Sequence, residues 1–259
     1  MNSSGTNEIL LIKKKFHIYD ASQVADVITV TDLLEEEKCR LFLQKQMQQL
    51  QAPSLPVTAS MFSKRYAYLV VASTLYSMVE FNGVFVLPLK ACSFSTKQTL
   101  SIQEYLCQWN QGMDSTREQW REKLLQELFS NHITPVWNML KKISGIPSVI
   151  LWENLAVRIN SVYRKILAQE VTSIKKQRVD SDFHYLKGAS GELFDLLENP
   201  ISRFLKIGEE LHIHPDRQTC CLYYQLKEDV EGIGYCTNCP IGRKRKRREK
   251  ETKEQKVLK

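Results

Sequence analysis

Residues 147–166 read PSVILWENLAVRINSVYRKI in a chain of 259 residues. Pro147 suits the start of a helix because it has no amide hydrogen to leave unpaired there. Apolar side chains then return every three or four residues, the spacing of one helix face; they are Trp152, Leu155, Ile159, Val162, Tyr163 and Ile166. The stretch predicts a long helix with one buried face and indicates a mainly helical protein.

The same spacing predicts further helices on both sides of this one. We expect them over residues 31–51, 58–80, 120–129, 133–143 and 182–197. Gly145 is typical of the residue that follows a helix. Asn82-Gly83 predicts a turn into a short strand over residues 84–87. The expected fold is therefore a mainly α helical bundle with a small β element.

Composition and charge limit the class of protein. Apolar residues make up 43% and charged residues 25%, ordinary values for a globular chain with a core. Residues 243–259 hold ten of the 36 basic and three of the 29 acidic residues, so the whole net charge of +7 lies in this tail. We expect the tail to be disordered and the rest of the chain to be neutral, which removes the main compositional support for nucleic-acid binding.

Neither a secretory signal nor a membrane span is expected. Residues 1–16 lack a basic segment followed by an apolar one. The most apolar stretch, residues 66–89, is interrupted by Ser, Thr, Glu and Asn, whereas a spanning helix needs about 20 nearly continuous apolar residues. We therefore expect a cytoplasmic protein. Structural disulfides are rare in the cytoplasm.

The seven cysteines fall into two groups. Three are scattered on apolar segments and are typical of small buried side chains: Cys39, Cys92 and Cys107. The other four lie within twenty residues: Cys220, Cys221, Cys236 and Cys239. This clustering is the strongest functional feature of the sequence.

Three interpretations of the cluster of cysteines stay open on spacing alone. Cys236 and Cys239 form a C-x-x-C pair, common in zinc sites, with His212 or His214 as further candidate ligands. The adjacent pair Cys220-Cys221 suits one tetrahedral ion poorly because neighbouring side chains point apart, so a wider 2Fe-2S cluster accommodates it better. The third interpretation is a set of reduced thiols or an adventitious disulfide without metal.

The residues around these cysteines resemble a known family. Residues 219–224 read TCCLYY and residues 235–240 read YCTNCP, similar to the C-terminal signature of FhuF-type ferric siderophore reductases. Residues 151–154, LWEN, are similar to a tryptophan-containing motif of the same proteins. One departure is the loop between Cys221 and Cys236, which is longer than usual in the family and carries the charged residues 227–231.

The resemblance implies a cofactor, an activity and a division of the chain. Cys220, Cys221, Cys236 and Cys239 would ligate a 2Fe-2S cluster in an irregular C-terminal lobe, residues 211–242, which the cluster staples. Residues 1–210 would form the helical body that holds a ferric siderophore or citrate-type chelate, and residues 243–259 the basic tail. Iron would be reduced in one-electron steps with electrons from a ferredoxin- or flavodoxin-like donor, so no catalytic side chain is assigned beyond the cluster ligands.

Substrate-binding residues are weaker predictions. Trp152, Asn154 and Arg158 share the long helix and are candidates for contact with the chelate, Arg158 with an anionic one. The alternative is that Trp152 packs in the core while Glu153 and Asn154 are solvated. Two other functions remain as alternatives to the reductase: an iron–sulfur sensor or interaction protein without a substrate, and a zinc-stapled nucleic-acid-binding protein that uses the basic tail.

Overall fold

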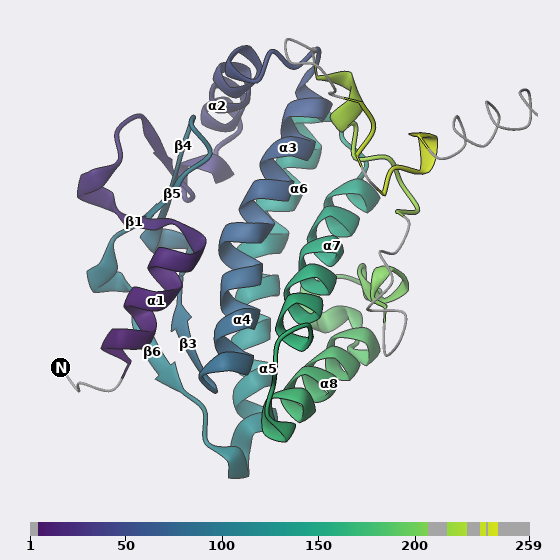
Figure 1. The fold of residues 1–259 in the computed structure, drawn as a ribbon. Helices are drawn as coiled ribbons and strands as arrows, with labels where there is room; N and C mark the ends of the chain where they lie inside the picture. The colour runs from purple at the N-terminus through teal and green to yellow at the C-terminus, as the bar shows by residue number, and fades with distance from the viewer. Residues whose placement is uncertain (1–4, 207–216, 227–233, 237, 243–259) are drawn as a thin grey trace, which may run out of the picture.

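The computed structural model describes residues 5–206, 217–226, 234–236 and 238–242. Its helices are α1 (Thr6–Phe16), α2 (Glu36–Gln49), α3 (Leu55–Ala67), α4 (Ser73–Glu80), α5 (Arg117–Leu128), α6 (Thr134–Ser144), α7 (Ser148–Leu167) and α8 (Ser173–Gly188). Its strands are β1 (Ile18–Asp20), β2 (Val27–Thr29), β3 (Gly83–Val86), β4 (Cys92–Ser95), β5 (Leu100–Ile102) and β6 (Gln108–Gln111). The prediction of a mainly helical protein with a small β element is confirmed (Figure 1).

The centre of the molecule is one continuous helix that packs along α7 (Figure 1). α3 passes into α4 through a wider π-helical segment, Tyr68–Ala72, so the chain stays helical from Leu55 to Glu80. Side chains on nearly every face of this helix are buried, as expected for a helix surrounded by the rest of a core. The expected helix over residues 58–80 is therefore confirmed, with its start three residues earlier.

Two small sheets cover one side of these helices (Figure 1). The first has the order β1-β5-β4-β2, with β1 and β5 parallel and the other pairs antiparallel. In the second, β3 pairs antiparallel with β6. Gly83 has no side chain because a Cβ there would lie 2.3 Å from the ring of Trp109 on β6. The turn at Asn82, with a φ of 47°, leads into β3 as the sequence predicts.

Two features of the chain differ from the sequence-based expectations. The helix expected over residues 182–197 is wrong in position, since α8 runs from Ser173 to Gly188. The chain then folds back tightly: a Cβ at Gly191 would lie 2.2 Å from the carbonyl oxygen of Leu196, and Asp195 has a φ of 52°. The helix α1 was not expected from the sequence pattern.

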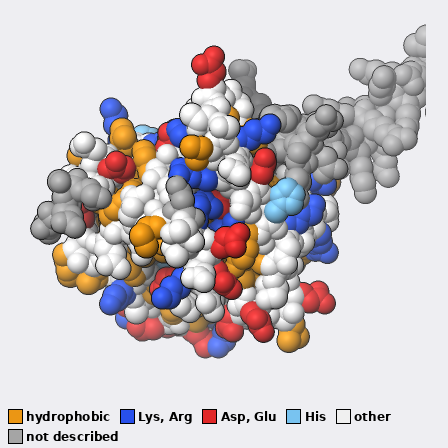
Figure 2. Space-filling view, turned by 90° about the horizontal axis from the view of Figure 1, so that it is seen from below, with side chains coloured by type: hydrophobic (Ala, Val, Ile, Leu, Met, Phe, Trp, Pro, Cys, Tyr) orange, Lys and Arg blue, Asp and Glu red, His pale blue; other side chains and the backbone are white. Residues whose placement is uncertain are grey.

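The outer surface fits the neutral charge expected for the folded part. Lys and Arg side chains and Asp and Glu side chains both lie across the face seen in Figure 2. No helix among the described residues is both long and apolar enough to cross a membrane. The basic tail, residues 243–259, lies outside the described residues, as do His212 and His214.

A buried ion cluster joins α8 to α5. The Asp182 side chain is fully buried and accepts two hydrogen bonds from the guanidinium of Arg117, at 2.6 and 2.8 Å. Arg121, also buried, lies 3.3 Å from the same carboxylate. Because both arginines face this one acid, its negative charge compensates them inside the protein.

We expect Asp182→Asn to lower the free energy of unfolding by about 3 kcal/mol, since the two arginines would keep their charge without the carboxylate. Urea unfolding followed by circular dichroism measures this as a lower midpoint at an unchanged slope. Asp180→Asn is the matched control, because Asp180 is exposed on the same helix. Equal losses for the two variants would contradict the role given to Asp182.

Candidate metal centre

The cysteine-bearing segments lie against the N-terminal halves of α3 and α7 (Figure 1). Ser60 on α3 donates a hydrogen bond of 2.7 Å to the carbonyl oxygen of Cys221. Asn154 on α7 in turn donates to the hydroxyl oxygens of Ser60, at 3.1 Å, and Ser63, at 2.9 Å. All four residues are buried, so this chain of bonds fixes the backbone of Cys221 to both helices.

Glu153 holds the residues just before Cys220. Its carboxylate, only 2% exposed, accepts hydrogen bonds from the amides of Gln218, at 2.6 Å, and Thr219, at 2.8 Å, and from the Thr219 hydroxyl. Arg217, also buried, lies 3.4 Å from the same carboxylate. The interpretation of Glu153 and Asn154 as solvated is therefore wrong, since both are buried against the lobe.

The two segments of the lobe are joined to each other as well. The amide of Arg217 donates to the carbonyl oxygen of Asn238, at 3.2 Å, and the rings of Tyr224 and Tyr235 are stacked with centroids 5.3 Å apart. These contacts bring the region before Cys220 close to the C-x-x-C segment.

One pair of cysteines joins the two segments, since the sulfur atoms of Cys221 and Cys236 are 3.7 Å apart. The other two are close enough to interact: besides burial, the thiols of Cys239 and Cys221 raise the pKa of Cys220. Leu222, directly after the adjacent cysteines, has a φ of 63°, and its amide donates to the Cys220 sulfur at 3.4 Å.

The electrostatic surroundings make the thiol of Cys221 more acidic than those of Cys220 and Cys236. The hydrogen bond from the Cys236 thiol, and then the positive charge of Lys64, lower the pKa of Cys221 to about 5. Lys64 lies on α3 with its Nζ atom 3.6 Å from the Cys221 sulfur and above the ring of Tyr223. Burial raises the pKa of Cys220 to about 11. Cys221 is accordingly a thiolate at neutral pH, the form that binds metals.

The distance within one pair fits a shared metal ion. Two thiolates bound to one tetrahedral ion through bonds of about 2.3 Å lie about 3.8 Å apart, close to the distance between Cys221 and Cys236. Among the described residues, however, no group of three or more His, Cys, Asp or Glu side chains is arranged to hold a single ion.

The other three cysteines lie elsewhere in the structure. Cys39 and Cys92 are buried, and Cys107 is half-buried. Burial is the largest cause that raises the pKa of Cys39 to about 11 and that of Cys107 to about 12. They are protonated at neutral pH and pack as small side chains.

A groove opens beside the lobe, and one candidate substrate residue lines it. The groove has a volume of about 520 Å³, and its wall includes Lys64, Tyr223 and Arg158. Trp152 is instead buried with its ring edge-on to Phe194, and Asn154 supports Ser60. The structure thus brings Arg158 to the groove and Trp152 and Asn154 into the interior.

Residues 60–188 match a family model described as "Ferric iron reductase FhuF-like transporter". The match places the protein in the class of ferric iron reductase-like proteins. The matched segment is about half of the chain, and the chain belongs to the FhuF-like family. The residues around the cysteines predicted the same family, and that prediction is confirmed. No curated protein matches the sequence. The matched segment ends before Cys220 but contains the residues that seat the lobe, Ser60, Lys64, Glu153 and Asn154.

We expect Glu153→Gln to loosen the lobe while leaving the helical body folded, because an amide would present a donor to the amides of Gln218 and Thr219. Hydrogen–deuterium exchange should show these two amides exchanging about tenfold faster or more, the effect of losing one buried charged acceptor. Glu170→Gln is the control, since Glu170 is exposed just beyond the same helix. Unchanged exchange at both amides would contradict the anchoring role of Glu153.

Proposed function

We propose that this protein binds a 2Fe-2S cluster and uses it to reduce ferric iron held in a siderophore or citrate-type chelate, so that ferrous iron is released in the cytoplasm. The observation that carries the proposal is the group of four neighbouring cysteines held on α3 and α7 beside an open groove, with the Cys221 and Cys236 sulfur atoms 3.7 Å apart. Membership of the FhuF-like ferric iron reductase family supports the same activity.

The cysteine arrangement favours a two-iron cluster over one zinc ion. Each iron of a 2Fe-2S cluster takes two thiolates; Cys221 and Cys236, with sulfur atoms 3.7 Å apart, would hold one iron, which leaves Cys220 and Cys239 for the other. A structural zinc ion would need its four ligands around one point. We propose all four cysteines as ligands within the lobe of residues 211–242, and residues 1–210 as the part that holds the chelate.

When bound, the cluster would supply one-electron transfer at low potential. The electron passes to Fe(III), which becomes Fe(II), and no covalent bond of the chelate forms or breaks. Hard oxygen ligands hold Fe(II) less tightly than Fe(III), so reduction releases the metal. The reaction needs no proton transfer. The side chains around the cysteines therefore have only to hold the cluster ligands in position. We propose a ferredoxin- or flavodoxin-like protein as the electron donor.

The residues of the chain around the ligands have positioning roles in this proposal. Glu153 and Ser60 hold the backbone next to Cys220 and Cys221. Lys64 places a positive charge beside the Cys221 sulfur and also lines the groove. Lys64 therefore connects the site of the ligands with the site of the chelate.

We expect protein purified without oxygen to contain two iron and two sulfide per chain, the content of a 2Fe-2S cluster, and to absorb visible light. Cys221→Ser should remove or destabilise the cluster, while Cys107→Ser, far from the lobe in the chain, should leave it intact. Metal analysis, sulfide analysis and absorption spectra measure this. Stoichiometric zinc without sulfide would overturn the cluster and favour the zinc-stapled alternative.

We expect reduced protein to be re-oxidised by ferric chelates, with ferrous iron appearing in a ferrous-specific trap. The protein is reduced with dithionite, freed of excess reductant and mixed under argon with ferric hydroxamate and ferric citrate-type chelates. Stopped-flow absorption should show a rate that saturates with chelate concentration, as binding before electron transfer requires. A rate that never saturates with any chelate would contradict the reductase and favour a sensor or interaction role.

A further inference from the structure

Two neighbouring hollows form one trough along the face of α7. The groove beside the lobe shares Tyr68, Arg158 and Lys165 with a second pocket of about 480 Å³. The second pocket extends to Lys15 and Tyr76. Both volumes lie within the range of small-molecule sites, about 300–1,000 Å³. We call the two hollows together the α7 trough.

The α7 trough is lined by positive charges from three helices. Its cationic residues are Lys15 on α1, Lys64 and Arg65 on α3, and Arg158 and Lys165 on α7. None of the described residues that line it is an Asp or a Glu. This local excess differs from the neutral balance of the chain outside its tail.

The cations of the trough are held by aromatic rings and backbone oxygens. The guanidinium groups of Arg65 and Arg158 both lie against one ring, that of Tyr68, with their carbon atoms 5.5 and 6.0 Å from its centroid. Arg158 donates through Nε to the carbonyl oxygen of Lys64, at 3.2 Å, and Arg65 donates through Nε to that of Gln98, at 3.0 Å. Each of these bonds uses one of the five donors of a guanidinium, and none of these partners supplies negative charge.

Arg158 shows the cost of this arrangement. Burial, followed by the positive charges of Arg217 and Arg65, lowers the pKa of Arg158, while Tyr68 and Cys221 only partly offset this; the guanidinium stays protonated at neutral pH. A group of like charges in a partly buried site is destabilised by mutual repulsion. A bound anion would offset this repulsion.

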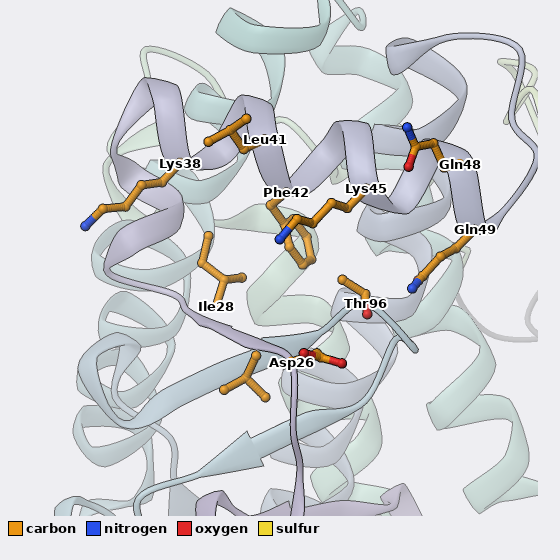
Figure 3. A pocket seen from close by; sticks show the side chains of 10 residues that line it. Asp26, Ile28, Lys38, Leu41, Phe42, Lys45, Gln48, Gln49 and Thr96 are labelled. Carbon is orange, nitrogen blue, oxygen red and sulfur yellow. The ribbon is translucent and has the colours of Figure 1, made fainter.

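A groove elsewhere on the protein differs from the α7 trough in the charge of its lining residues. It lies between α2, β2 and Thr96, the residue after β4, and Lys38, Lys45 and Asp26 are among its lining residues (Figure 3). Lys38 there makes ion pairs with Asp32, at 2.7 Å, and Glu35, at 2.9 Å. This groove thus combines both signs of charge, whereas the described lining of the α7 trough has one.

We infer that the α7 trough binds a ferric chelate with a net negative charge, of the carboxylate or catecholate type, in preference to a neutral or cationic hydroxamate chelate. The inference rests on the proposed function, because it takes the trough as the place where the chelate is reduced. Lys64 ends the trough 3.6 Å from the Cys221 sulfur, between the anionic ligand set and the anionic chelate. Its charge offsets the repulsion between them.

Binding is tested with gallium(III) chelates, because gallium(III) resembles ferric iron in charge and size but is not reduced. A trianionic gallium tris(catecholate) and a neutral gallium trihydroxamate are titrated into the full chain with its cluster, by calorimetry. We expect the trianionic complex to bind about tenfold tighter or more, with an affinity that falls as salt rises. Equal affinity for the two complexes would overturn the inference.

Variants assign the effect to the trough. Arg158→Gln and Lys165→Gln should each weaken the tris(catecholate) complex by about tenfold, the effect of losing one charged contact, and leave the trihydroxamate unchanged. Lys165 is exposed, so its variant remains informative if Arg158→Gln does not fold. Lys45→Gln is the control, since Lys45 is exposed and lines the other groove (Figure 3). Unchanged binding in Lys165→Gln would contradict the trough as the site.

The inference and the proposed function fail in different ways. If the gallium complexes discriminate as expected but no ferric chelate re-oxidises the reduced protein, the reductase fails and the anion site stands. If ferric chelates re-oxidise the protein with saturation but the trianionic and neutral gallium complexes bind equally, and Arg158→Gln and Lys165→Gln change neither affinity, the reductase stands and the charge selectivity fails.

Discussion

The candidate site depends on one buried carboxylate. Glu153 lies inside the protein on α7, where an isolated charge would be strongly destabilised. The backbone of the lobe resolves this, because the amides of Gln218 and Thr219 donate to it and Arg217 neutralises it. Two otherwise irregular residues thereby gain fixed positions next to Cys220. The lobe thus supplies hydrogen-bond donors to the buried carboxylate of α7, and α7 supplies an acceptor to the backbone amides of the lobe.

This dependence explains how a lobe with little regular structure is held. The described part of the lobe contains only short helical segments, Tyr223–Gln225 and residues 240–242, so its own backbone bonds are few. Its attachments run instead through side chains of α3 and α7: Ser60 to Cys221, Glu153 to the segment before Cys220, and Asn154 behind Ser60. Because α3 and α7 pack directly against each other in the core, the two anchors are rigid with respect to one another.

The sequence predicted the helices whose buried faces repeat over several turns and missed what depends on distant pairing. The spacing in residues 147–166 and Gly145 located α7 and the end of α6 correctly. Strands of three or four residues carry too short a pattern, and β1 is paired with β5 across about eighty residues of chain. α8 was misplaced because its apolar residues are few and its first turns are polar. The cysteines as a cluster were visible in the sequence, but the approach of Cys221 to Cys236 depends on the turn at Leu222 and on anchors far away in the chain.

Glu153 was missed for a related physical reason. A charged residue on a helix is usually solvated, and only its partners at residues 217–219 make its burial favourable. The family match reaches this residue but ends before the cysteines. The contact between the matched segment and the lobe requires small polar residues on α3 and α7 rather than larger apolar ones. These residues are Ser60, Ser63 and Asn154. Ser60 donates to Cys221, while Ser63 and Asn154 donate to Ser60, so an apolar replacement at any of the three would fill the space but remove a bond from the chain that holds the cysteine.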